Sequence, residues 1–424
     1  MSDVAVAGDE PPTPPHSPAT APTAVPLLAP RDGVPPVVCD PEDLQLAVRR
    51  LAAGSGPVAV DAERASGYRY GQRAYLVQLR RAGAGTVLID PVPLRDLSAV
   101  GAALATTEWV VHAASQDLPC LAELGMRPSS VFDTELAGRL LGHSRVGLGA
   151  LVESELGLLL EKGHAAADWS TRPLPEPWLR YAALDVEVLV ELRDVLATQL
   201  AEQGKTGWAE QEFAAIVAAG PPPPRVDPWR RTSGLHRIRS RRQLAVARSL
   251  WEARDRAGQA RDISPGRVLP DLAIVAAALA MPSSEAALVA LPEFAGRGQR
   301  RHSRLWWEAV ERALAEPEAA LPANSRVPVG PPPARAWPDR DPAAAGRLAA
   351  CRAAMAELSE RWATPVENLL APDTLRRLCW TPPDPIDAGT VADHFRQHGA
   401  RPWQVELITG PVVAALTAAA QPPD

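Results

Sequence analysis

The sequence predicts an α/β domain with a mixed sheet, followed by two all-α helical bundles. Residues 38–218 begin with runs of β-branched and apolar residues joined by short turns and then alternate strand with helix, which favours a mixed sheet flanked by helices. Residues 232–318 and 341–418 carry apolar residues at helical spacing and show no strand pattern. Proline-rich segments separate these blocks, so we expect three folded units.

The proline-rich segments set the expected boundaries. Residues 1–37 contain mostly Pro, Ala, Thr and Asp, and such a segment cannot bury enough surface to offset its ordering entropy, so we expect a disordered leader. Residues 219–231 and 319–340 contain consecutive prolines, which favour stiff, extended spacers. We therefore expect two linkers there.

Within the first block the elements follow in a simple order. The short glycine-containing turn Ala82–Gly85 favours an antiparallel meander of the first three strands, and Gly125 ends the first helix. The expected strands are Val58–Glu63, Ala74–Leu79, Thr86–Asp90 and Trp109–His112, followed by a helix at Gln116–Leu124 and a helical region that ends with Pro177–Leu200. The two later blocks share a similar order of helices, which suggests a distant internal duplication.

Composition limits the possible functions. The 424 residues are 46% hydrophobic and 22% charged, with a net charge of −6, so the whole chain has no basic field and nucleic-acid binding would need a local patch. The four cysteines form no C-x-x-C or zinc-ligand pattern, which favours a reduced, cytoplasmic protein. No secretory signal or membrane-length apolar run is present, so we expect no membrane partner, and no obligate protein partner is evident.

Five residues stand where their side chains can converge. Asp61 and Glu63 are two positions apart on a strand and share one face. Asp117 lies at the start of a helix after a later strand, and Tyr181 and Asp185 share a helix face at i and i+4. Taken singly, each has an ordinary alternative: a surface charge, a helix-end carboxylate or a tyrosine packed against the sheet.

Together these positions resemble the tyrosine subclass of the DEDD exonucleases. The order D-x-E, Asp, Y-x-x-x-D is the signature of that superfamily, and the match extends over residues 38–205. The segments that resemble the ribonuclease D family are Arg69–Leu79, His112–Leu121, Lys162, Asp168–Leu174 and Tyr181–Val186. The resemblance implies a ribonuclease H-like exonuclease domain. It departs at Ala113, where many relatives have asparagine or another residue able to help shape the site, and this departure removes no ligand.

The resemblance also implies a metal-dependent 3′-5′ exoribonuclease that trims structured RNAs such as tRNA precursors and releases 5′-mononucleotides. Two Mg²⁺ or Mn²⁺ ions, which prefer hard oxygen ligands, would be held by the four carboxylates. Asp61 would bridge both ions, Glu63 and Asp185 would bind on the nucleophile side, and Asp117 on the leaving-group side. Tyr181 would orient the attacking water. With a reference pKa near 10 it is a poor base.

The helical blocks resemble HRDC domains, with the second copy more divergent, and we expect them to grip RNA. The first contains an arginine-rich stretch at 225–261, the footprint expected for a phosphate backbone, although a solvated helix face is the alternative. His112 is expected to be a core histidine rather than a base. The candidate nucleic-acid contacts are Arg237, Arg239, Arg241 and Arg242, together with Lys162, Trp169 and Arg172, for which a packing or surface role is equally open.

Two other functions stay open on the sequence. The carboxylates do not distinguish ribose from deoxyribose, so a 3′-5′ exonuclease acting on DNA is one alternative. A catalytically retired RNA-binding protein is the other, and the presence of all five expected residues argues against it.

Overall fold

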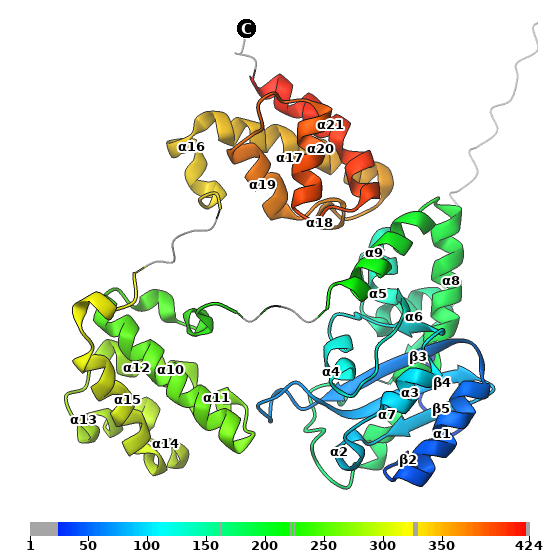
Figure 1. Ribbon diagram of the computed structural model, residues 1–424, viewed down its shortest axis with the longest axis horizontal. Helices are drawn as coiled ribbons and strands as arrows, with labels where there is room; N and C mark the ends of the chain where they lie inside the picture. Colours follow the sequence, from blue (N-terminus) through cyan, green and yellow to red (C-terminus); the bar gives the residue numbers. More distant parts are fainter. Residues whose placement is uncertain (1–23, 162, 221–222, 224, 325–329, 421–424) are drawn as a thin grey trace, which may run out of the picture.

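The computed structural model describes residues 24–420 except 162, 221–222, 224 and 325–329, and its first domain is built on a six-stranded mixed sheet (Figure 1). The strand order is β2-β5-β4-β3-β6-β7, and β4 runs antiparallel to both of its neighbours while the other pairs are parallel. The predicted mixed sheet and its β3-β4-β5 meander are therefore confirmed. The strands are β2 (Val37–Val38), β3 (Ser55–Arg64), β4 (Ala74–Ala82), β5 (Gly85–Ile89), β6 (Glu108–Val111) and β7 (Ser130–Asp133).

Helices cover both faces of this sheet, and the alternation along β3 shows which residue faces which layer. Val58, Val60 and Ala62 pack into the main core, whereas Ala59 packs with Val186 on the opposite face. The helices of this domain are α1 (Pro41–Ala53), α2 (Pro91–Leu94), α3 (Ser98–Ala103), α4 (Leu118–Glu123), α5 (Thr134–Leu141), α6 (Leu148–Leu156), α7 (Glu176–Glu187), α8 (Leu189–Glu202) and α9 (Thr206–Ala218).

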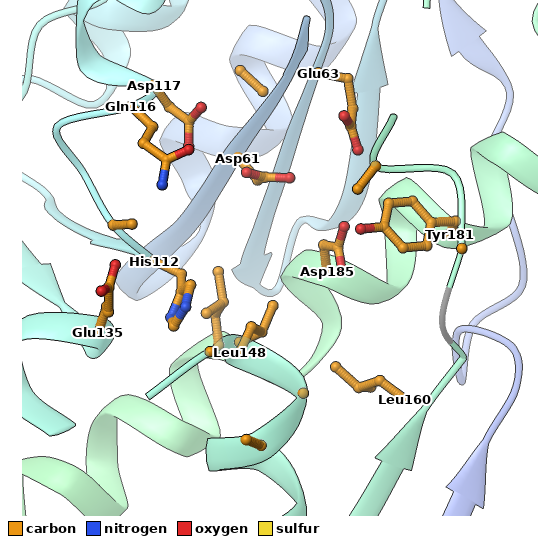
Figure 2. A pocket seen from close by; sticks show the side chains of 18 of the residues that line it. Asp61, Glu63, His112, Gln116, Asp117, Glu135, Leu148, Leu160, Tyr181 and Asp185 are labelled. Carbon is orange, nitrogen blue, oxygen red and sulfur yellow. The ribbon is translucent and has the colours of Figure 1, made fainter. Parts of the chain in front are cut away.

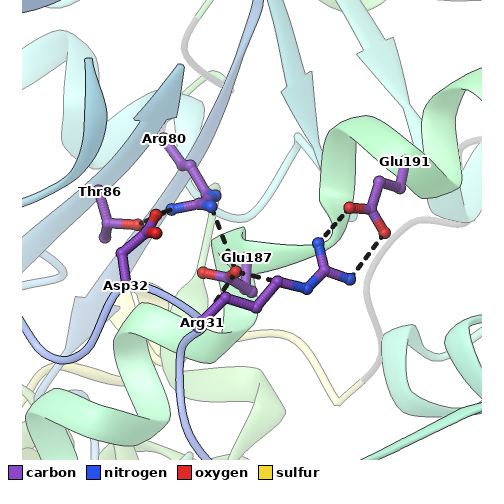
Figure 3. Close-up of polar contacts among 6 residues, drawn as sticks. All are labelled: Arg31, Asp32, Arg80, Thr86, Glu187 and Glu191. Atoms are coloured by element: carbon purple, nitrogen blue, oxygen red, sulfur yellow. Dashed lines mark hydrogen bonds and ion pairs between the residues drawn. The ribbon is translucent and has the colours of Figure 1, made fainter. Parts of the chain in front are cut away.

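A second, two-stranded sheet corrects one boundary. β1 (Val25–Leu27) pairs in parallel with β8 (Leu158–Leu160), so the disordered leader predicted for residues 1–37 does not extend through β1, while residues 1–23 lie outside the described part of the chain. Beyond β1, Arg31 pairs with Glu191, and both Arg31 and Arg80 contact the fully buried side chain of Glu187 (Figure 3). These contacts hold the N-terminal segment against α7 and α8.

The described residues after this domain fold into helices, as predicted. The second block contains α10 (Arg241–Arg261), α11 (Pro265–Val268), α12 (Asp271–Ala280), α13 (Glu285–Val289), α14 (Arg297–Arg301) and α15 (Ser303–Ala315). The third contains α16 (Trp337–Arg340), α17 (Pro342–Trp362), α18 (Val366–Leu369), α19 (Pro372–Trp380), α20 (Ala388–Gln397) and α21 (Pro402–Ala420). In the described residues, no helix is long and apolar enough to cross a bilayer.

Both predicted linkers contain residues that belong to the bundles. Trp229 is 4% exposed and packs in the core of the second block, and Trp337 is fully buried against Trp380 in the third. An indole that leaves water contributes a large apolar area. The chain therefore becomes ordered earlier than proline content alone predicts.

Candidate active site

Two carboxylates enter the site from β3 because of the strand's alternation. Asp61 and Glu63 continue the face of Ala59, whereas Val60 and Ala62 point into the core. Oxygen atoms of Asp61, Glu63 and Asp185 all lie within 4.8 Å of one another (Figure 2). The D-x-E pair and the carboxylate of α7 therefore form one cluster.

Helix α7 supplies two more of the five predicted residues, Tyr181 and Asp185, from one of its faces. Ala182 and Ala183 are buried in the cluster that packs α7 on the sheet, which turns Tyr181 and Asp185 toward β3. The Tyr181 hydroxyl points toward the carboxylate of Asp185 (Figure 2). The structure thus brings the phenol beside the carboxylate cluster, as the i and i+4 spacing predicts.

Asp117 reaches the site from the turn between β6 and α4. It is 6% exposed, lies close enough to Asp61 for the charge of that carboxylate to raise its pKa, and lies 3.4 Å from the guanidinium of Arg64. All four predicted carboxylates and Tyr181 line a single cavity of about 710 Å³. Asp61 is the member shared by the triad with Glu63 and Asp185 and by the pair with Asp117.

The electrostatics of this cluster favour cation binding. Burial, reinforced by the neighbouring carboxylates, raises the pKa of Glu63 to about 10, and burial with the charge of Asp61 raises the pKa of Asp117 to about 8. The pKa values of Asp61 and Asp185 are also raised, mainly by burial. Positive charge would relieve this repulsion, and an all-oxygen donor set suits hard divalent ions, so the residues fit the predicted metals.

Two residues of the site escaped prediction. Gln78 is fully buried on β4, directly opposite Asp61 in the strand register, and its amide donates to Asp61 Oδ2 at 3.3 Å. Arg64, the residue after the D-x-E pair, contacts both Asp117 and Gln116. Gln78 could have been noticed in the sequence, because it is the single polar residue in the apolar run Leu76–Leu79.

Two of the predicted RNA contacts are structural instead. Trp169 is fully buried beside Trp178 and Tyr181 and donates to His164 O, so it cannot stack on a base. Arg172 donates all five of its guanidinium N–H groups to protein oxygens, including both oxygens of Asp90. Both predicted nucleic-acid contacts are corrected to packing roles, and Lys162 lies outside the described residues.

The four arginines predicted to contact RNA differ in their exposure. Arg241 donates to Leu321 O, and Arg242 donates to carbonyls at the end of α15, while both side chains stay partly exposed. Their contact with RNA stays a prediction. Arg237 and Arg239 are exposed, and their contact with nucleic acid stays a prediction.

Comparison with known proteins agrees with this geometry. A family profile described as a 3′-5′ exonuclease matches residues 36–201, an HRDC domain profile matches 243–310, and a profile described as a 3′ to 5′ exonuclease C-terminal domain matches 330–416. Ribonuclease D of Gluconacetobacter diazotrophicus is 32% identical over 310 residues, which cover 71% of this chain and 78% of the relative. The chain belongs to the ribonuclease D family.

Solved structures support the same fold. A protein from Bifidobacterium adolescentis superposes with a TM-score of 0.85 at 36% identity, over 93% of this chain and all of that one. Escherichia coli RNase D, described as an exoribonuclease involved in structured RNA processing, gives a TM-score of 0.66 at 24% identity over 91% of this chain and 99% of its own, which shows the fold. As a ribonuclease D family member with the exonuclease domain, this chain is a 3′-5′ exoribonuclease.

Proposed function

We propose that this exoribonuclease trims the 3′ ends of structured RNAs such as tRNA precursors, by two-metal-ion hydrolysis that releases 5′-mononucleotides. The observation that supports the chemistry best is the convergence of four carboxylates and a tyrosine in one cavity. Structured RNA as the substrate is supported by the similar fold of Escherichia coli RNase D, an exoribonuclease involved in structured RNA processing. The HRDC domain is the part of the chain that would hold such an RNA beyond the cavity.

The carboxylates have distinct places in this proposal. Two divalent ions bound there would polarise the scissile phosphate, lower the pKa of the attacking water and stabilise the leaving oxygen. Asp61 would help to hold both ions, because it lies in the triad with Glu63 and Asp185 and is also a neighbour of Asp117 in the cavity. Gln78 fixes one oxygen of Asp61 and so holds the shared ligand in place.

Tyr181 acts by position and not as a base. Burial and the nearby carboxylates raise the pKa of its hydroxyl above the ordinary value, so the phenol stays protonated at neutral pH. A protonated hydroxyl beside Asp185 can hydrogen-bond a water molecule and fix its orientation. Loss of this hydroxyl, as in Tyr181→Phe, removes the orientation and leaves the carboxylates unchanged.

The experiment compares 3′-extended tRNA, unstructured RNA and single-stranded DNA side by side, with Mg²⁺ or Mn²⁺ present. We expect Asp61→Asn and Asp185→Asn to lower the rate at least about 100-fold, because each removes part of the charge that binds the metals. Glu153→Gln removes an exposed acid from the cavity rim, outside the cluster, and serves as the matched control.

Each part of the proposal can fail separately. An Asp185→Asn variant that still degrades RNA would show that the carboxylates have been assigned wrongly. A higher rate on DNA than on RNA would identify the substrate as DNA. Faster digestion of unstructured RNA than of 3′-extended tRNA would remove structured RNA from the proposal and leave the chemistry.

A further inference from the structure

We infer that His112 is a specificity-determining residue whose Nε2 accepts a hydrogen bond from the ribose 2′-hydroxyl at the 3′ end of the substrate. This inference rests on the proposed 3′-trimming function and adds the group that distinguishes RNA from DNA. It also corrects the expectation of a core histidine, because His112 is only half-buried and lines the same cavity as the carboxylates (Figure 2).

The sheet brings Asp61 and His112 to the same cavity. Ala59 pairs with Val110 in the parallel β3–β6 ladder, and these two residues lie in one apolar cluster on the α7 face. Two residues farther along the chain are Asp61, on β3, and His112, directly after the end of β6, and both side chains line the cavity. The spacing of adjacent strands is about 4.8 Å. A phosphate held at Asp61 therefore carries its ribose into the neighbourhood of His112.

The hydrogen bonds behind His112 fix which ring nitrogen carries the proton. The Thr134 hydroxyl donates to Val111 O at 3.2 Å, and that carbonyl can only accept. A hydroxyl has one proton to give, so the 2.9 Å contact between Thr134 Oγ1 and His112 Nδ1 must be donated by the ring. In the neutral imidazole, a proton on Nδ1 leaves Nε2 with a free lone pair.

This lone pair has no partner within the described residues. The neighbouring Glu135 can only accept, and its carboxylate is bound by Arg139 at 3.0 and 2.5 Å. Burial lowers the pKa of His112, against the opposing charges of Asp133 and Glu135, and so favours the neutral ring. His112 Nε2 and the Glu135 carboxylate are therefore both hydrogen-bond acceptors on this side of the cavity, and a substrate group that contacts His112 Nε2 must be a donor.

RNA has donors on the sugar and on the bases, and the position of His112 favours the sugar. Phosphate oxygens only accept, whereas the ribose 2′-hydroxyls, the terminal 3′-hydroxyl and the amino and ring N–H groups of the bases can donate. His112 lines the same cavity as Asp61, where the scissile phosphate must lie, and the ribose is bonded to that phosphate while the base donors are farther out. We assign the contact to the 2′-hydroxyl, which DNA lacks, and the comparison of RNA with DNA distinguishes it from the 3′-hydroxyl, which both carry.

The test measures kcat/KM on RNA and DNA oligonucleotides of one sequence, with single 2′-deoxy substitutions at the last and penultimate nucleotides. His112→Phe keeps an aromatic ring of similar size and removes the acceptor, whereas His112→Gln keeps an acceptor. We expect the RNA:DNA ratio to fall about three- to tenfold in His112→Phe, which is the effect of one neutral hydrogen bond, and less in His112→Gln. Thr134→Val frees the tautomer, so its ratio is expected to fall between those of the wild type and His112→Phe.

Binding of the same oligonucleotides to Asp185→Asn chains, with and without His112→Phe, gives a second measurement that does not require hydrolysis. Equal losses on RNA and DNA, or an unchanged ratio, would overturn the inference. So would a loss on A, C and G ends that is absent on U ends, because it would identify a base amine as the donor. A wild-type chain that trims no RNA would refute the proposed function, and the binding ratio would still decide the role of His112.

Discussion

The turn that delivers Asp117 shows how one buried side chain can set the site. Asp133, 4% exposed, accepts N–H groups from Ala113 and Ala114 at 3.1 and 2.8 Å, and it also caps α5 through Glu135 and Leu136. Ala113 has φ near 60°, a left-handed conformation that asparagine tolerates better than alanine. The departure noted at Ala113 therefore makes the turn depend on Asp133.

Asp133→Asn is expected to raise the Mg²⁺ concentration needed for half-maximal activity and to lower the unfolding free energy by about 1–3 kcal/mol. The amide keeps the acceptor that caps α5 but turns an N–H group toward Ala114 N, so the turn before Asp117 loosens. Metal titrations of activity and urea denaturation measure the two effects. Asp40→Asn is the matched control, because Asp40 caps α1 in the same way and lies outside the site. Equal shifts of metal dependence in both variants would contradict this role for Asp133.

Residue spacing explains which site residues the sequence could predict. Asp61 and Glu63, or Tyr181 and Asp185, are related by the period of their own strand or helix, so one local pattern fixes their common face. Trp169 and Arg172 have no such relation, because their burial depends on Trp178 and Asp90, which come from other segments. Residue type alone therefore suggested that Trp169 and Arg172 contact RNA, whereas in the folded chain both side chains are bound by other parts of the protein.

At the scale of elements, length separates the strands that the sequence shows most clearly from those that it cannot show. The ten residues of β3 and the nine of β4 are long enough to show a strand pattern. By contrast, β1 and β8 have three residues each and β2 has two, so no period can be seen in them. These short strands form because a neighbouring strand pairs with them, and that information is not local to their sequence.

Helix ends show the same dependence on distant residues. Lys205 is 2% exposed, and its Nζ donates to Leu140 O and Trp362 O at 2.6 Å, near the C-termini of α5 and α17. The unpaired carbonyls of two helix ends thus share one cation, which their dipoles favour. Burial lowers the pKa of Lys205 to about 8, so the ammonium is still largely charged at pH 7.

Lys205→Met is expected to lower the unfolding free energy by about 1–3 kcal/mol, because two buried carbonyls lose a donor. Thr364→Val removes a second donor to Leu140 O, at 2.9 Å, and provides the partner for a double-mutant cycle followed by urea denaturation. We expect the two losses to be non-additive, since the Thr364 hydroxyl also contacts Trp362 O at 3.0 Å and the two variants share both carbonyls. Strict additivity would show that Lys205 and Thr364 stabilise the chain independently.

At the scale of the whole molecule, the two helical bundles meet the exonuclease domain in different ways. The third block joins the main hydrophobic core. The ring of Trp403 stacks on that of Trp208, with 4.4 Å between the ring centroids. The second block instead binds the loop between β3 and β4 through polar contacts, which include Tyr70 with Asp255 at 3.1 Å and Arg267 with Gly67 O at 2.8 Å. Figure 1 shows α11 beside this loop. Neither docking mode is encoded by a local pattern, so neither could be predicted from the sequence.

The loop bound by the second block begins directly after the strand that carries Asp61 and Glu63. Arg267 also lies 4.1 Å from the centroid of the Tyr68 ring, and Ser264 N donates to Tyr68 O at 2.9 Å. The HRDC domain is thus held at a fixed position relative to the carboxylates. An RNA that spans both would meet two preorganised surfaces, whereas a short oligonucleotide would occupy the cavity alone.

Arg267→Gln is therefore expected to lower kcat/KM on a 3′-extended tRNA about three- to tenfold while changing it less than twofold on a tetranucleotide. The substitution removes the hydrogen bond to Gly67 O and the cation over Tyr68, so the HRDC domain is no longer held in register with the cavity. Arg304→Gln is the matched control: it removes an equal charge from the same domain at an exposed position paired with Glu308. Parallel kinetics on the two substrates measure the effect. Equal losses in both variants would show that the charge of the HRDC domain, and not its docking, governs the processing of structured RNA.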